Sequence, residues 1–141
     1  MPPPLPELNA ENTPFWTSGR DGRLRFQSCR SCESMIHPPL PRCPSCLGDA
    51  LEWVAVSGRG VVYARTVNHH RWNDDAAEPY CLALVDIDGA AGVRLTTQII
   101  GCQPESVAVG MAVEVVFVDR DPVFLPYFRL RSGSTPEGPI L

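Results

Sequence analysis

The chain has 141 residues, with 12 Lys+Arg against 16 Asp+Glu, a formal net charge of −4 and 44% hydrophobic residues. This length allows one ordinary domain, or a small module joined to a second one, and excludes large barrels. All twelve basic residues are arginines, which excludes chemistry that needs a lysine, and the acidic balance argues against general binding to nucleic-acid backbones.

Residues 1–22 are expected to form an extended arm followed by a short helix. The prolines from Pro2 to Pro6 cannot form a helix or a central strand. Thr13-Pro14 then provides an N-cap and a first-turn proline, and Gly19 ends the helix after about two turns. The helix carries two bulky side chains, Phe15 and Trp16.

Residues 23–49 hold two closely spaced pairs of cysteines, which follow an alternating stretch that predicts a strand. A CxxC turn presents two thiolates to one ion, and two such turns complete a tetrahedral shell around Zn²⁺. Four thiolates leave no open position for water, so we expect a structural zinc ion, although rubredoxin-like iron would use the same ligands. The candidate metal ligands are Cys29, Cys32, Cys43 and Cys46.

The cellular compartment of the protein affects how the cysteine pairs are interpreted. The start of the chain lacks the pattern of a secretory signal, and its apolar runs are shorter than the ~20 residues of a membrane helix. We therefore expect a soluble, cytoplasmic protein, in which paired cysteines indicate metal more often than disulfides. His37 is expected at the surface or beside the ligands, and Cys81 and Cys102 are expected to pack as small apolar residues.

Residues 50–131 alternate between short apolar runs and turn residues, which is typical of strands. Five or six strands in this length favour a small barrel, and five is the strand number of the OB-fold. The predicted strands are Leu51 to Val56, Gly60 to Val67, Tyr80 to Ile87, Val93 to Ile99, Ala112 to Val118 and Leu125 to Leu130. Residues 132–141, rich in Gly, Pro and Ser, are expected to form a flexible tail.

Two groups of residues on the predicted barrel are candidates for contact with a ligand or partner. The loop between the second and third predicted strands places an aromatic anchor beside basic side chains, as binding surfaces often do. Arginines on the neighbouring strands could make bidentate contacts with phosphate, or could be ordinary outward-facing residues. The candidates are Arg59, Arg65, His69, His70, Arg71 and Trp72.

The order of these features resembles the zinc-ribbon plus OB-fold family of acyl-CoA-associated proteins, long catalogued as a domain of unknown function. The resemblance rests on the Phe15-Trp16 helix, CRSC at Cys29 to Cys32, CPSC at Cys43 to Cys46, the segment EWVAVSGRGVVYARTV and the strand GMAVEVVF. It implies a mainly β protein with a short N-terminal helix, a rubredoxin-like zinc ribbon and a five-stranded OB-fold barrel. One departure is that Glu33 and Leu47 replace the glycine common after each CxxC turn.

The resemblance also implies a function. Members of the family are encoded or fused with thiolase-superfamily enzymes and with enoyl-CoA hydratases, including those of steroid side-chain and aromatic-acid degradation. The resemblance implies that they are non-catalytic partners of thiolase-like enzymes, some of them of lipid-transfer-protein-type aldolases. This chain is therefore expected to form a hetero-oligomer with a thiolase or aldolase that acts on acyl-CoA, to dock through the ribbon and the helix with Phe15 and Trp16, and to help form the CoA channel. The alternatives are a single-stranded nucleic-acid-binding module and a stand-alone enzyme using His69 and His70.

Overall fold

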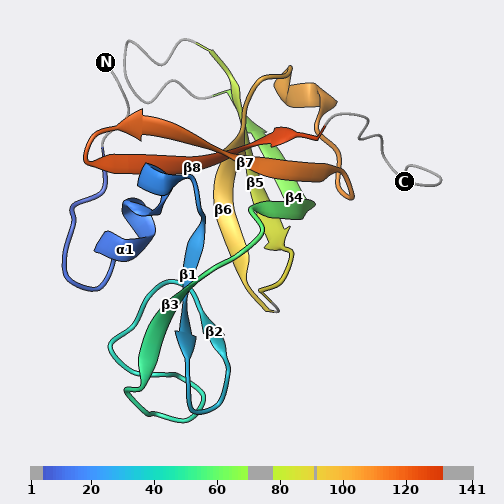
Figure 1. Cartoon of the computed structure of the whole chain (residues 1–141). Coiled ribbons are helices and arrows are strands. Elements are labelled where there is room, and N and C mark those ends of the chain that lie inside the picture. The colour runs from blue at the N-terminus through green and yellow to red at the C-terminus, as the bar shows by residue number, and fades with distance from the viewer. Residues whose placement is uncertain (1–4, 70–77, 91, 132–141) are drawn as a thin grey trace.

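The computed structural model describes residues 5–69, 78–90 and 92–131 and consists mainly of strands (Figure 1). A short helix, α1 (Thr13–Trp16), and a 3-10 turn, η1 (Ser18–Asp21), precede the sheets, and a second turn, η2 (Pro104–Ser106), precedes β7. The strands are β1 (Arg25–Cys29), β2 (Met35–Ile36), β3 (Leu51–Ala55), β4 (Arg59–Asn68), β5 (Tyr80–Ile87), β6 (Arg94–Ile99), β7 (Ala112–Arg120) and β8 (Val123–Leu130). Within the described ranges, no helix is long and apolar enough to cross a membrane.

The N-terminal α-helix starts one residue earlier than the sequence predicts, and it is also shorter. Asn12, and not Thr13, is the N-cap, because the Asn9 side chain accepts hydrogen bonds from the backbone N–H groups of Glu11 and Asn12 and closes a turn before the helix. The α-helix ends at Trp16, and η1 continues the segment to Gly22, whose φ of +79° allows the chain to reverse into β1.

The ribbon is a three-stranded antiparallel sheet in the order β2-β1-β3. β3 pairs with the whole of β1, from Arg25 opposite Ala55 to Cys29 opposite Leu51. The first of the six strands predicted after residue 50 therefore lies in the ribbon sheet and not in the barrel. In Figure 1 this sheet forms a lobe at one end of the molecule, with β1 and β3 leading toward the barrel.

The remaining five strands form a closed barrel in the order β4-β5-β6-β8-β7, which confirms the predicted five-stranded OB-fold. The β4-β5, β5-β6 and β7-β8 pairs are long and antiparallel. The parallel contact between β6 and β8 is much shorter, because Ile99 opposite Phe128 is the single registered pair among the described residues.

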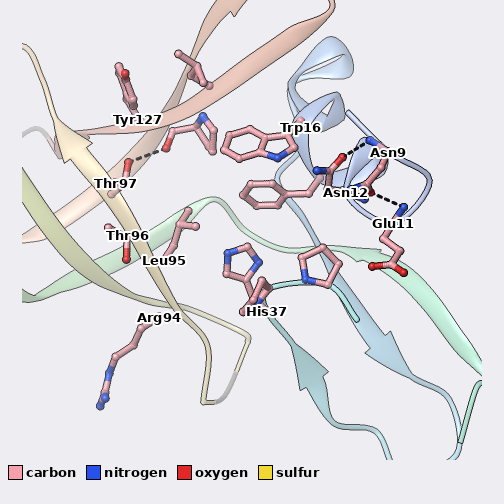
Figure 2. Close-up of a pocket in the computed structure, with 15 residues that line it drawn as sticks. Asn9, Glu11, Asn12, Trp16, His37, Arg94, Leu95, Thr96, Thr97 and Tyr127 are labelled. Carbon is pink, nitrogen blue, oxygen red and sulfur yellow. Dashed lines mark hydrogen bonds between the residues drawn. The ribbon is translucent and has the colours of Figure 1, made fainter. Parts of the chain in front are cut away.

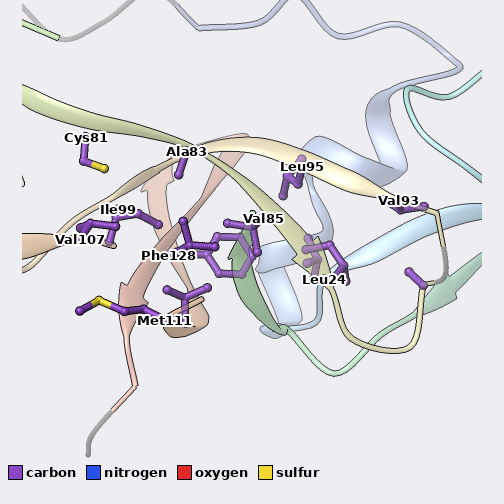
Figure 3. Packing of buried hydrophobic residues seen from close by; sticks show 14 of the residues in the cluster. Leu24, Cys81, Ala83, Val85, Val93, Leu95, Ile99, Val107, Met111 and Phe128 are labelled. Atoms are coloured by element: carbon purple, nitrogen blue, oxygen red, sulfur yellow. The ribbon is translucent and has the colours of Figure 1, made fainter. Parts of the chain in front are cut away.

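The main core fills the barrel and extends to the N-terminal segments (Figure 3). Alternate residues of β5 are buried, as expected for a strand with one face toward a core. Leu24, just before β1, and Phe26, near its start, belong to the same cluster as Val85 and Phe128. Ile36 packs with two cysteines in a separate small cluster in the ribbon. β1 thus joins two cores.

Candidate metal centre

The two CxxC turns bring their four thiols together at the end of the ribbon. Cys29 is the last residue of β1 and Cys32 follows it, whereas Cys43 and Cys46 lie between β2 and β3. The Sγ atoms of all four lie within 4.8 Å of one another. The Cys29–Cys46 and Cys32–Cys43 Sγ distances are 3.7 and 3.5 Å. A tetrahedral site with Zn–S bonds of ~2.3 Å requires sulfur atoms about 3.8 Å apart. The four cysteines therefore fit one tetrahedral metal ion.

Backbone hydrogen bonds set both turns in the same way. The N–H groups of Glu33 and Leu47 donate to the carbonyls of Cys29 and Cys43, both at 2.8 Å. Glu33 and Leu47 each have a φ of +64°, the left-handed conformation that a glycine would adopt more readily. The replacement of glycine seen in the sequence has therefore left the geometry of both turns intact.

The surroundings of the thiols suit a structural ion. Cys29 and Cys43 are buried, whereas Cys32 and Cys46 are exposed. A hydrogen bond with Ser34 lowers the pKa of the Cys32 thiol to about 6, which favours the thiolate that binds metal. The neighbouring thiols raise the pKa of Cys46 to about 11, as expected where four thiols crowd together. With four protein ligands available, a bound zinc ion would supply folding free energy and would have no open position for a substrate.

The loop after β2 is tied to the barrel end of the ribbon by a buried glutamine. The Gln27 side chain donates to the Leu40 carbonyl and accepts from the Leu40 N–H, both at 2.9 Å. Beside it, the His37 ring lies 4.8 Å from the ring of Phe15 and 5.2 Å from that of Phe26. His37, expected at the surface or beside the metal ligands, is half-buried against these two rings, and burial lowers its pKa.

This packing creates a groove beside the ribbon, which we call the α1–β6 groove (Figure 2). Its volume is about 560 Å³, within the range of ligand sites. It lies between the segment around α1, the loop after β2 and the strands β6 and β8, and its walls include Trp16, His37, Pro38, Thr96 and Tyr127. No spacing in the sequence indicates it, because its walls come from four separate segments.

The structure places the two aromatic residues of α1 differently. Phe15 lines the groove too, but it is only 3% exposed and belongs to the main core. Trp16 is half-buried, lines the groove and contacts Phe15 edge-on at 4.9 Å. Of this pair, Trp16 is therefore the side chain available to a partner.

The candidate contact residues on the barrel do not form one cluster. Arg59 and Arg65 are both exposed on β4, six residues or about 20 Å apart. Arg59 lies opposite Glu114, whereas Arg65 borders a shallow apolar cavity of about 240 Å³ with Leu82. His69 is exposed after the end of β4, and His70, Arg71 and Trp72 lie outside the described residues.

Comparisons with known proteins match nearly the whole chain. Residues 16–52 match a family model described as "ChsH2, rubredoxin-like zinc ribbon domain". Residues 53–118 match a model described as "ChsH2, C-terminal OB-fold domain". The metal centre described above lies in the part of the chain that matches the zinc ribbon.

Two curated relatives are similar over most of the chain. A "Probable enoyl-CoA hydratase alpha subunit" from Thermomonospora curvata is 35% identical over 89% of this chain and 39% of its own length. A "DUF35 domain-containing scaffold protein" from Methanothermobacter thermautotrophicus is 34% identical over 67% of this chain and 71% of its own length. The chain thus spans about two fifths of the hydratase subunit.

One solved structure is similar over its full length. A chain of the structure described as "Ltp2-ChsH2(DUF35) aldolase" matches with a TM-score of 0.79 and 32% sequence identity. The match covers 89% of this chain and 98% of that one.

Proposed function

The chain belongs to the family that joins a ChsH2-type zinc ribbon to an OB-fold domain. From this premise we propose that it is a non-catalytic, zinc-containing subunit of a thiolase-superfamily enzyme that acts on acyl-CoA. The observation that carries the proposal is the full-length match to a chain of the "Ltp2-ChsH2(DUF35) aldolase" structure. The names of relatives as an enzyme subunit and as a scaffold protein support the same role.

Two surface carboxylates, Asp21 and Glu114, are unsuited to acid–base catalysis. An acid or base in catalysis needs a pKa near the working pH and access to a substrate. Here the Arg25 side chain lowers the pKa of Asp21 to about 2, and Arg129 lowers the pKa of Glu114. Both carboxylates are bound in surface ion pairs, which is a structural use of charge.

Zinc serves the partner contact indirectly in this proposal. The ribbon has only a small core of its own, so its shape depends on the ion held by the four cysteines. The ribbon and α1, which carries Trp16, then dock on the enzyme. The exposed arginines of β4, Arg59 and Arg65, and the loop from His69 to Trp72 contribute to the channel for the CoA moiety.

Co-purification tests the subunit role. The chain is co-expressed with a thiolase-superfamily aldolase from the same genome, and the eluted complex is measured by light scattering and by acyl-CoA turnover. We expect one hetero-oligomer with a more soluble and more active enzyme. If the chain elutes alone and the enzyme's activity is the same without it, the proposal is wrong.

A pair of cysteine variants tests the dependence on zinc. Cys46→Ser removes one of the four ligands, so we expect loss of bound zinc and of the complex. The matched control is Cys102→Ser, which changes a half-buried cysteine outside the metal centre and should keep both. A complex that forms normally with zinc-free Cys46→Ser would show that the ribbon is not needed for docking.

The CoA contact and the nucleic-acid alternative need separate measurements. In the complex, Arg65→Ala should raise KM for the acyl-CoA, whereas Arg120→Ala, an exposed arginine at the end of β7, should not. For nucleic acid, tight binding of single strands at physiological salt in a gel-shift assay would favour that alternative.

A further inference from the structure

Strand β6 is paired along its full length on one side only. Toward β5 it is paired from Arg94 to Ile99. Toward β8 the one registered pair among the described residues is Ile99 with Phe128, supported by a hydrogen bond of 2.8 Å from the Ile100 N–H to the Phe128 carbonyl. At Pro126, β8 has no N–H to offer, and its carbonyl accepts instead from the Thr97 hydroxyl at 2.7 Å.

The backbone groups of β6 that lack a strand partner can be identified from the alternation along the strand. Backbone N–H and C=O groups alternate between the two sides of a strand. Because Ile100 donates toward β8, the backbone groups of Thr96 and Arg94 point to the same side. That side is the α1–β6 groove, which both residues line (Figure 2). In the described part of the chain these backbone groups have no strand partner there, so β6 has an open edge inside a groove.

The charges at the groove indicate what kind of chain would fit this edge. The Arg94 side chain is already paired with Asp86 at 2.8 Å and lies over the Tyr63 ring at 3.6 Å. Glu11, at the α1 end of the groove, is exposed and has no ion-pair partner within the described ranges. The uncompensated charge at the groove is therefore negative, which favours a neutral or basic occupant over an anionic one such as a nucleotide phosphate.

We propose that the α1–β6 groove binds an extended, non-acidic peptide segment of the partner subunit, which hydrogen-bonds to the open edge of β6 and places an apolar side chain beside Trp16. Addition of a strand to an exposed sheet edge is a recurring mode of peptide recognition. The walls formed by Trp16, Pro38 and Tyr127 supply apolar contact for the inserted side chain. This inference rests on the proposed function for the existence of the partner.

Amide hydrogen exchange of the zinc-loaded full chain, measured residue by residue by NMR, tests the inference directly. In the free chain, the Thr96 and Arg94 amides should exchange quickly, whereas Leu95 and Thr97, which point toward β5, should be protected. In complex with the thiolase-superfamily aldolase of the co-purification experiment, exchange at Thr96 should slow at least about tenfold, because its N–H gains an acceptor.

Two variants, each with a matched control, test the role of this edge of β6 through the affinity for the partner enzyme. Thr96→Pro removes the N–H that points into the groove and should weaken the complex at least tenfold, whereas Thr96→Val keeps this N–H and should bind nearly as wild type. Glu11→Arg reverses the free charge at the groove and should also weaken binding. Glu105→Arg makes the same charge change on η2, away from the groove, and should not.

The outcomes separate this inference from the proposed function. If the complex forms but Thr96 stays unprotected and Glu11→Arg binds normally, the groove is not the docking site and the subunit role still holds. If no complex forms, the proposed function fails. Protection of Thr96 by CoA alone would overturn the peptide assignment, as would slow exchange of Thr96 in the free chain. If Thr96→Pro does not fold, the exchange measurement and the comparison of Glu11→Arg with Glu105→Arg still test whether the groove is the docking site.

Discussion

Leu47 occupies a backbone conformation that costs an L-residue free energy. Its φ is +64°, and its side chain is 71% exposed at the tip of the second CxxC turn. The left-handed conformation costs a residue with a Cβ roughly 1–2 kcal/mol. The exposed side chain gains little from burial in the isolated chain, so its contribution to the fold is unfavourable.

Replacing Leu47 with glycine should therefore stabilise the isolated chain. We expect the free energy of unfolding of the zinc-loaded protein to rise by about 1 kcal/mol, since the strain removed exceeds the added entropy of the unfolded chain. Chemical denaturation measures the change. Val109→Gly is the control, because Val109 is 61% exposed but does not have a positive φ, and this variant should gain nothing. Destabilisation by Leu47→Gly would show that the side chain makes an important contact.

His37 couples the stability of the ribbon junction to pH. Burial lowers its pKa below the ordinary value of 6.5, and its Nδ1 atom is buried with no hydrogen-bond partner among the described residues. As the pH falls through 6.5, the unfolded chain takes up a proton before the folded one does. The contribution of His37 to stability is therefore fully present above pH 6.5 and is lost as the pH falls toward its folded pKa.

Comparison with His37→Phe isolates this effect, because phenylalanine keeps a ring between Phe15 and Phe26 but does not titrate. The measurement is the difference in the free energy of unfolding between wild type and variant across this pH range. We expect wild type to lose stability relative to the variant on acidification. Parallel curves for the two proteins would mean that His37 is not the titrating group.

Sequence reasoning succeeded at the residue scale where spacing alone determines geometry. The four cysteines were identified because a CxxC turn places two thiolates close together whatever surrounds it. The packing of His37 against Phe15 and the α1–β6 groove could not be predicted, because they depend on how the ribbon loop, α1 and the barrel meet. The pattern of one segment carries no information on such contacts.

At the scale of elements, Gly60 shows why the turn into the barrel has its particular sequence. It lies in β4 opposite Ile87, and a Cβ at this position would overlap the Asp86 carbonyl oxygen and a methyl group of Val85. The close approach of β4 to β5 thus requires the absence of a side chain here. In contrast, Gly89 has a φ of +81° and open space around it, so it is needed for its conformation alone.

The variant Gly60→Ala should accordingly be destabilised by overpacking, by about 1–3 kcal/mol. Gly89→Ala, which introduces strain without a clash, should lose only about 1 kcal/mol. Thermal unfolding of the two variants beside wild type measures both changes. Equal losses would indicate that the backbone near Gly60 moves apart at little cost.

The strands of the barrel were predictable because alternation and turn residues mark them locally, as β5 shows by matching its expected bounds. The sheet to which β3 belongs could not be predicted, because a run such as LEWVA does not specify the strand with which it pairs. Its five registered pairs with β1 place it in the ribbon. The bounds of an element could be predicted better than its neighbours, which long-range contacts determine.

At the scale of the whole molecule, the chain has two cores of very different size. The barrel core includes large side chains such as Phe128, whereas the ribbon cluster consists of Cys29, Ile36 and Cys43 with Leu51 against it. The larger core can fold on buried apolar area alone, but the ribbon depends on metal binding, which contributes on the order of 10 kcal/mol in zinc-finger peptides.

Removal of zinc by a strong chelator should therefore act on one core and spare the other. We expect the amides of β2 and of both CxxC turns to lose their protection from hydrogen exchange, while those of β5 and β7 keep theirs. Re-addition of zinc should restore the first group. Loss of protection across the barrel on chelation would contradict this division into two cores.

The wall of the α1–β6 groove formed by His37 and Pro38 belongs to the ribbon, and Gln27 holds the same loop in place from β1. A chain that has not acquired its metal would thus present a groove with one side missing. If this groove receives a peptide of a partner subunit as proposed, binding of the partner would depend on prior loading of the metal.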